Sequence, residues 1–158
     1  MYKRLLIPLD GSRFGSRALT TAIEIAKRFN AEIFLLQVIK PAAPIPPAMG
    51  MTGTGSPAEV KISMEVATAE DKRNASLAKQ YLSRKTRELR SRGIKASYQA
   101  VIGEPADTIM KLARRKKSDL IIMSSHGKGG LKRAILGSVT DEVIRKAGKP
   151  VLVVRPKS

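Results

Sequence analysis

Residues 118–158 read SDLIIMSSHGKGGLKRAILGSVTDEVIRKAGKPVLVVRPKS, and this stretch decides the fold. An apolar run at 118–124 turns sharply into glycines, a helical pattern covers 138–147, and a second apolar run covers 149–155. Continuous apolar runs, in contrast to alternating ones, are typical of parallel strands buried on both faces. The stretch therefore predicts a strand, a crossover helix and a second, parallel strand.

The same alternation runs back to the first residues of the chain. Further apolar runs lie at 3–9, 31–39 and 95–102, and helical patterns lie at 13–29, at 62–92 and from Pro105 onward. Within 62–92, Val66, Ala78, Leu82 and Leu89 are expected on one inward-facing stripe. Strands that alternate with helices predict an α/β fold: an open, Rossmann-like, parallel five-stranded sheet with helices on both faces.

Length and composition limit the possible classes of protein. The 158 residues, 42% of them apolar, fit one domain over 1–158. The absence of cysteine excludes disulfides and thiolate metal sites. We find no apolar window of about 18 residues, so no membrane span is expected. The apolar run after Met1 is too short for a signal peptide, and we expect a cytoplasmic protein.

A segment at about 40–60 interrupts this compact pattern. It is rich in proline and glycine and almost uncharged, and we predict a flexible loop there. Two interpretations stay open: a surface excursion without function, or a lid beyond the second strand that offers Ile45, Met49 and Met51 as adaptable apolar contacts.

Small and polar residues gather where the predicted strands end. Pro8, Leu9 and Asp10 end the first apolar run, Val38 lies near the end of the second, and Ser124 follows Met123 in the fourth. Ligands of open parallel sheets bind beyond the carboxyl ends of the strands, where the strand order reverses. We therefore predict a ligand site at this edge.

The helix that begins near Gly137 suggests an anionic ligand. A helix N-terminus presents unpaired N–H groups and a partial positive charge, which suit a phosphate. Gly127 would let the backbone approach closely, and Lys128 would add charge. The competing interpretation is structural: Ser138 and Asp141 could form an ordinary helix cap.

These motifs together resemble the universal stress protein family over nearly the whole chain, from LLIPLDGS to KPVLVVRP. The nucleotide-binding members carry Gly, two residues, Gly, nine residues, then Gly followed by Ser or Thr. Here the pattern reads Ser124-Ser125-His126-Gly127, nine residues, and Gly137-Ser138. The spacing is kept, and Ser124 replaces the first glycine.

The resemblance implies a strand order of 3-2-1-4-5 and ATP, with Mg²⁺, as the ligand; AMP and ADP stay open. Pro8, Leu9 and Asp10 would border the adenosine, and the Val38 backbone would meet the adenine edge. The phosphates would be held by Gly127, Gly137, Ser138, Val139 and Thr140. The resemblance also favours a homodimer, and an apolar edge strand at 150–155 points the same way.

Two other classes of function compete with an ATP-binding regulatory protein. The net charge of +17 would suit a module that binds nucleic acid or acidic partners, although few aromatic residues are available for base stacking. An adenylating ligase would carry a Ser-Gly-Gly-type loop after the first strand, where this chain has Asp10-Gly11-Ser12. His126 has no evident carboxylate partner and the chain has no cysteine nucleophile, so we expect little or no hydrolysis.

Overall fold

The computed structural model describes residues 1–43, 56–125 and 136–155. Its strands form one parallel sheet in the order β3-β2-β1-β4-β5, which confirms the predicted α/β fold and strand order. The strands are β1 (Arg4–Pro8), β2 (Glu32–Ile39), β3 (Ala96–Ile102), β4 (Leu120–Ser124) and β5 (Val151–Val154). The helices are α1 (Arg13–Phe29), α2 (Pro57–Ser91), α3 (Pro105–Arg115) and α4 (Ser138–Lys146).

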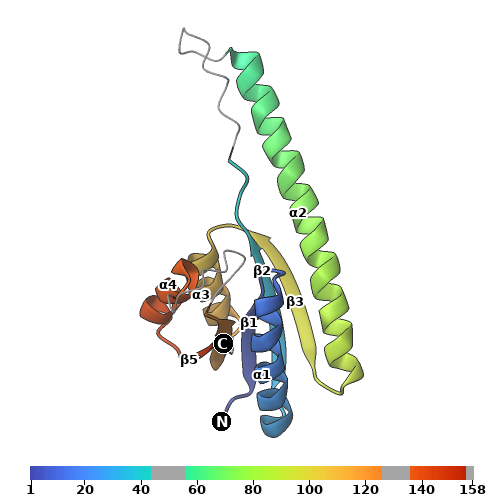
Figure 1. Cartoon of the computed structure of the whole chain (residues 1–158), viewed down its shortest axis with the longest axis vertical. Helices are drawn as coiled ribbons and strands as arrows, with labels where there is room; N and C mark the ends of the chain where they lie inside the picture. Colours follow the sequence, from blue (N-terminus) through green and yellow to red (C-terminus); the bar gives the residue numbers. More distant parts are fainter. Residues whose placement is uncertain (44–55, 126–135, 156–158) are drawn as a thin grey trace.

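The helices cover both faces of the sheet (Figure 1). One core cluster joins α1 and α2 to strand residues such as Leu5, Ile7 and Leu35. The other cluster joins α3 and α4 to Leu6 and Leu36 on the opposite face. Neighbouring residues of one strand therefore enter different cores, and this explains why the strand sequences are continuously apolar.

Helix α2 begins at Pro57, earlier than the residue 62 that the sequence predicted. Ser56 and Glu59 form a capping box: Glu59 N–H donates to Ser56 Oγ at 3.3 Å, and Ser56 N–H donates to Glu59 Oε2 at 2.6 Å. Pro57 suits the first helical position, because it has no N–H to leave unpaired. The prediction of a loop as far as residue 60 was therefore wrong at its end, while residues 44–55 lie outside the described ranges.

The inward stripe of α2 was also predicted wrongly at one position. Ala67 is buried, whereas Val66 is 46% exposed. Eleven residues, about three helical turns, separate Ala67 from Ala78, so these two share a face; Val66 is rotated away by about 100°. Between Pro57 and Leu77, Ala67 alone is buried, because this part of α2 extends beyond the sheet (Figure 1).

The length and composition of the helices decide whether one of them could cross a membrane. Within the described residues, none of the helices combines the length and the apolar character needed to span a bilayer.

Candidate functional site

The carboxyl ends of β1, β2 and β4 lie next to one another, since these strands are parallel neighbours in the sheet. Pro8 is the last residue of β1, and Leu9 is buried beyond it. The Leu9 N–H donates to the Leu36 carbonyl at 2.7 Å, which ties the end of β1 to β2. The predicted site residues of these three strands therefore lie at one end of the sheet, where the carboxyl ends of the strands meet.

Asp10 carries a buried acceptor atom at this edge. Its Oδ1 accepts a hydrogen bond from the Ser12 N–H at 2.9 Å, which shapes the turn into α1. Its Oδ2 is buried and receives no hydrogen bond from any described residue. A buried acceptor without a donor costs about 1–3 kcal/mol, so a donor supplied by a ligand would stabilise this carboxylate.

A second acceptor of this kind belongs to Gln37 on β2, a residue that our sequence analysis did not select. Its Oε1 is buried and unpaired within the described part of the chain. The sequence signal was present, because Gln37 is a polar residue near the end of an otherwise apolar run. Next to it, the predicted site residue Val38 packs against the core on the α3 and α4 face.

Tyr81 on α2 is the other residue that sequence reasoning missed. It is half-buried and packs against the core that α1 and α2 share. Burial raises the pKa of the Tyr81 hydroxyl, and the negative charge of Asp10 raises it further. Tyr81 therefore lies on the face of the sheet that α1 and α2 cover, and no local sequence pattern connects it with Asp10.

The end of β4 and the start of α4 are held together by two hydrogen bonds. Thr140 Oγ1 donates to the Ser124 carbonyl at 3.0 Å, and the Gly137 N–H donates to the Ser125 carbonyl at 2.8 Å. Met123 and Thr140 are buried, and Val139 packs against the core on the α3 and α4 face. Gly127 and Lys128, together with His126, lie outside the described residues.

The first turn of α4 has no side-chain cap. Gly137 is its N-cap residue, and Ser138 is the exposed first residue of the helix. The Asp141 carboxylate pairs instead with Arg145 at 2.7 Å, so the structural interpretation of Ser138 and Asp141 as a cap was wrong. The first N–H groups of a helix lack intrahelical acceptors, so this end is electrically suited to an anion.

Gly137 is not required by the backbone conformation at its position. Its φ of −61° and ψ of 146° are accessible to any residue. A Cβ atom there would lie 3.4 Å from the Ser125 carbonyl oxygen, an ordinary contact distance. Neither the backbone conformation nor the contact with Ser125 therefore requires a glycine at this position.

The densest basic cluster lies away from this edge. Lys111 and residues 114–117 occupy the C-terminal part of α3 and the turn that leads to the amino end of β4. The amino end of β4 lies at the opposite end of the sheet from the carboxyl ends of the strands. This cluster therefore does not add charge to the candidate site.

Comparison with known protein families shows which family this chain belongs to. Residues 1–155 match the model of the universal stress protein family. The chain belongs to the universal stress protein family.

Its relatives within the universal stress proteins are similar along almost the entire chain. Universal stress protein MJ0531 of Methanocaldococcus jannaschii is 36% identical over 155 residues, covering 98% of this chain and 83% of that protein. MJ0577 of the same organism is 34% identical, covering 100% and 98%. The solved structure of MJ0577 superposes with a TM-score of 0.81 over 100% of this chain and 99% of the other. UspA from Lactobacillus plantarum is 26% identical, with a TM-score of 0.76 and 98% coverage of both chains.

Proposed function

We propose that this universal stress protein binds an adenine nucleotide, ATP with Mg²⁺, at the carboxyl edge of β1, β2 and β4. The observation that carries the proposal is a pair of buried acceptors, Asp10 Oδ2 and Gln37 Oε1, that no described residue satisfies, at the same end of the sheet as a helix start without a side-chain cap. The first feature calls for hydrogen-bond donors, and the second suits an anion. A nucleoside phosphate supplies both in one molecule.

The proposed roles follow the strand order. Gly137, Ser138, Val139 and Thr140 would hold phosphates with the first turn of α4, together with Gly127 and Lys128. Pro8, Leu9 and Asp10 would border the adenosine, and the backbone of Val38 would meet the adenine. Met123 and Ser124, at the end of β4, would lie between the adenosine and the phosphates of the nucleotide. AMP and ADP would use the same adenosine half with fewer phosphate contacts.

The nucleotide is held as a regulatory ligand and is not turned over rapidly. Asp10 has a structural hydrogen bond and a proposed ligand contact, and neither role activates water. We place the protein in the cytoplasm, as a homodimer that pairs through β5.

A direct experiment tests nucleotide binding. Heat denaturation of one sample of the purified protein releases any bound nucleotide for identification. Calorimetry on a second, nucleotide-free sample of folded protein then measures the binding of ATP, ADP and AMP. We expect ATP to bind, and Asp10→Ala to weaken all three nucleotides by a similar factor, since Asp10 would contact the adenosine that they share.

Two results would contradict the proposal. One is the absence of binding heat up to millimolar ATP with folded protein. The other, which concerns only the regulatory role, is ATP turnover above roughly one per second, the low end for ordinary enzymes.

A further inference from the structure

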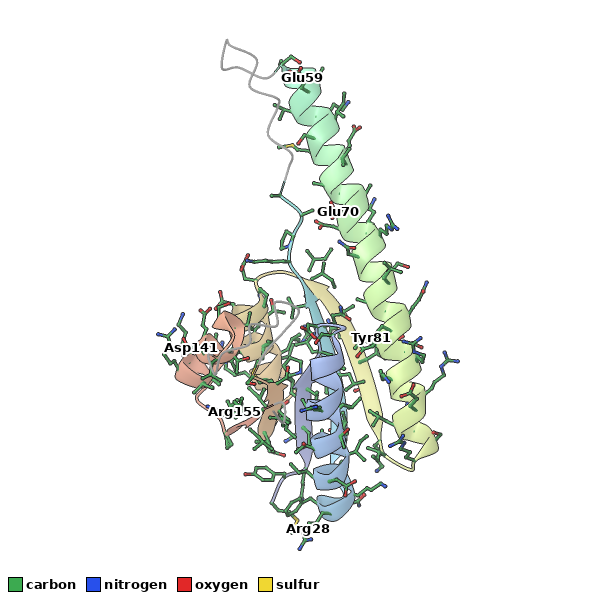
Figure 2. All side chains as sticks on the ribbon, in the orientation of Figure 1. Arg28, Glu59, Glu70, Tyr81, Asp141 and Arg155 are labelled. Atoms are coloured by element: carbon green, nitrogen blue, oxygen red, sulfur yellow. The ribbon has the colours of Figure 1, made fainter. Side chains whose placement is uncertain are left out.

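Helix α2 continues beyond the sheet, and this protruding half exposes apolar side chains (Figure 1). Figure 2 shows Glu59 near its tip and Tyr81 where α2 runs beside the sheet. Between them, Ile62 is 60% exposed, Val66 46% and Leu77 53%. Helices in proteins are stabilised mainly by the packing of an apolar face, so these side chains indicate a contact outside the chain's own core.

The exposed apolar side chains share one face of the helix. Spacings of four, three, four and four residues separate Ile62, Val66, Ala69, Arg73 and Leu77, and all five residues are exposed. Such spacings place side chains on one side of a helix, in the pattern of a helix–helix seam. We call these five residues the outer stripe.

The outer stripe faces away from the sheet. Its central residue, Ala69, is two positions after the buried Ala67, which corresponds to about 160° around the helix. On the inner side, Asp71 Oδ1 accepts a hydrogen bond from the Ala42 N–H at 2.8 Å, which ties α2 to the chain that leaves β2. The rotation of the helix is therefore fixed, and a partner can approach the outer stripe from the solvent.

The charge of α2 changes sign along its length. Residues 57–71 contain four carboxylates and one lysine, whereas residues 72–91 contain seven lysines or arginines and one carboxylate. Because the whole chain carries a net charge of +17, most surfaces of two copies repel each other. Two antiparallel α2 helices would bring the acidic half of each against the basic half of the other, while a parallel pair would bring like charges together. The charge pattern therefore favours a second copy of this chain, in the antiparallel direction, as the partner of the outer stripe.

The outer stripe is also complementary to itself when it is reversed. Ile62 and Leu77 are its two ends, and the midpoint between them lies next to Ala69. In an antiparallel pair centred there, Ile62 would contact the partner's Leu77, and Val66 would contact the aliphatic stem of the partner's Arg73. Ala69 would lie at the two-fold axis, where its small side chain allows the two helices to approach closely.

One pair of opposite charges flanks the centre of the stripe. Glu65 and Lys72 are both exposed and lie seven residues apart, on the same side of the stripe. In the antiparallel pair, Glu65 would lie beside the partner's Lys72, and the two-fold symmetry would repeat this contact. Such a peripheral pair contributes little energy, but it selects the direction and register of the helices.

We propose that the outer stripe of α2 pairs in the antiparallel direction with the outer stripe of a second copy of this chain. The stripe is about 22 Å long, at a rise of 1.5 Å per residue. This is short for a stable protein–protein interface, so the pairing is weaker than micromolar. It joins dimers of this chain into larger assemblies at high protein concentration, and it does not involve the candidate nucleotide site.

The absence of cysteine from the chain allows a direct test by disulfide cross-linking. Ile62→Cys, Ala69→Cys and Leu77→Cys are made as single variants and oxidised well above micromolar concentration, and peptide mass spectrometry identifies the linked residues. Ala69→Cys should form covalent dimers rapidly, because this position lies at the two-fold axis. Ile62→Cys alone should link slowly, because it lies about 22 Å from its own counterpart. A mixture of Ile62→Cys and Leu77→Cys should give the 62–77 link.

Thr68→Cys is the matched control. This position is adjacent to Ala69 and equally part of the exposed helix surface, but it is rotated by about 100° away from it. If Ala69→Cys links no faster than Thr68→Cys, as it would if a different protein covered the stripe, the proposal is wrong. If Ile62→Cys links to itself faster than to Leu77→Cys, the helices run parallel and the antiparallel pair is overturned.

Charge reversal tests the register independently of the cysteine positions. In the Ala69→Cys background, Glu65→Lys and Lys72→Glu should each slow cross-linking by about 2- to 10-fold, because each places like charges together twice. The two reversals in one chain should restore the rate, since the pair is then present in inverted form. Glu24→Lys, an equal charge change at an exposed position of α1, is the control and should slow cross-linking less than Glu65→Lys does. A combined variant that stays as slow as the single reversals would contradict the contact between Glu65 and the partner's Lys72, and with it the proposed register.

Discussion

Thr140 Oγ1 donates a hydrogen bond to the Ser124 carbonyl at 3.0 Å. Ser124 is the last residue of β4, and Thr140 lies in the first turn of α4, so one side chain fixes the helix start against the strand end. Thr140 is also buried, and the position of the α4 N-terminus therefore depends on this bond and on packing, not on a helix cap.

Thr140→Val should separate this role from packing. Valine has a similar shape but no hydroxyl, so the variant should lose about 1–3 kcal/mol of unfolding free energy. Its affinity for ATP should fall by a larger factor than its affinity for AMP. Denaturant unfolding and calorimetry measure the two effects. Thr140→Ser, which keeps the hydroxyl, is the control and should bind ATP nearly as well as the wild type. A larger loss in Thr140→Ser than in Thr140→Val would show that the methyl group, not the hydrogen bond, matters.

Gly137 should be more important for ligand binding than for stability. Its backbone angles suit any residue and a Cβ atom has room, so Gly137→Ala should fold with nearly unchanged stability. Gly137→Val should reduce ATP affinity far more than Ser138→Ala, because a branched side chain blocks the backbone approach while the serine variant loses one hydroxyl, about 1.5–3 kcal/mol at most. Similar small losses in both variants would place the phosphates elsewhere.

Asp119 should make stability depend on acidic pH. Its Oδ2 accepts hydrogen bonds from the N–H groups of Lys3 and Arg4, each at 2.8 Å, and the bond from Lys3 is the main cause that lowers the Asp119 pKa. A lowered pKa means that the carboxylate stabilises the fold above its unfolded pKa of about 3.9, and that this contribution is lost as pH falls through the folded value.

We therefore expect Asp119→Asn to cost about 1 kcal/mol at pH 7, where the charge-assisted bonds are lost from a partly exposed site. The difference from the wild type should start to shrink below the unfolded pKa of about 3.9 and should vanish only below the lowered folded pKa, where both proteins carry an uncharged side chain. Urea unfolding across this pH range measures it. Glu32→Gln, at the exposed start of β2, is the control for the loss of one negative charge; a difference between Asp119→Asn and the wild type that persists at pH 2 would contradict the explanation.

Strand β5 is an edge strand, and we predict that it pairs with β5 of a second copy. The carbonyls of Pro150 and Val154 accept hydrogen bonds from Ile121 in β4 and from Ser125 directly after it, at 3.0 Å each. By alternation, the N–H of Val153 points to the free edge. Val153→Pro removes one outward donor and leaves the ladder to β4 intact, as edge-strand prolines do. This variant should be monomeric or insoluble while the wild type is a dimer in light scattering across micromolar concentrations.

Two results would contradict dimerisation through β5. The first is a wild type that is monomeric throughout the dilution series. The second is a dimeric Val153→Pro variant. Tyr98→Pro would disturb the opposite edge strand, β3, and is the control that should leave dimers intact if it folds.

The order of elements could be predicted because its signals are local. Continuous apolar runs such as 31–39, turn residues such as Asp10-Gly11, and Pro105 at a helix start depend only on neighbouring residues. The earlier start of α2 was also encoded locally, in Ser56, Pro57 and Glu59, and sequence reasoning missed it because it took proline and glycine as signs of a loop. The strand order, by contrast, was implied by the family resemblance and confirmed by the sheet.

The sequence by itself determined which segments become strands and helices, and it placed Asp10, Ser124 and Gly137 at strand ends and a helix start. Only the tertiary structure decided which side chains meet there. Gln37 lies beside the turn that follows Asp10 because β2 pairs with β1, and Tyr81 enters the shared core because α2 packs against β2 and β3; no short-range pattern records such contacts. The physical reason is that hydrogen-bond satisfaction is a property of the packed chain: an acceptor is unpaired only once every neighbouring element has taken its place.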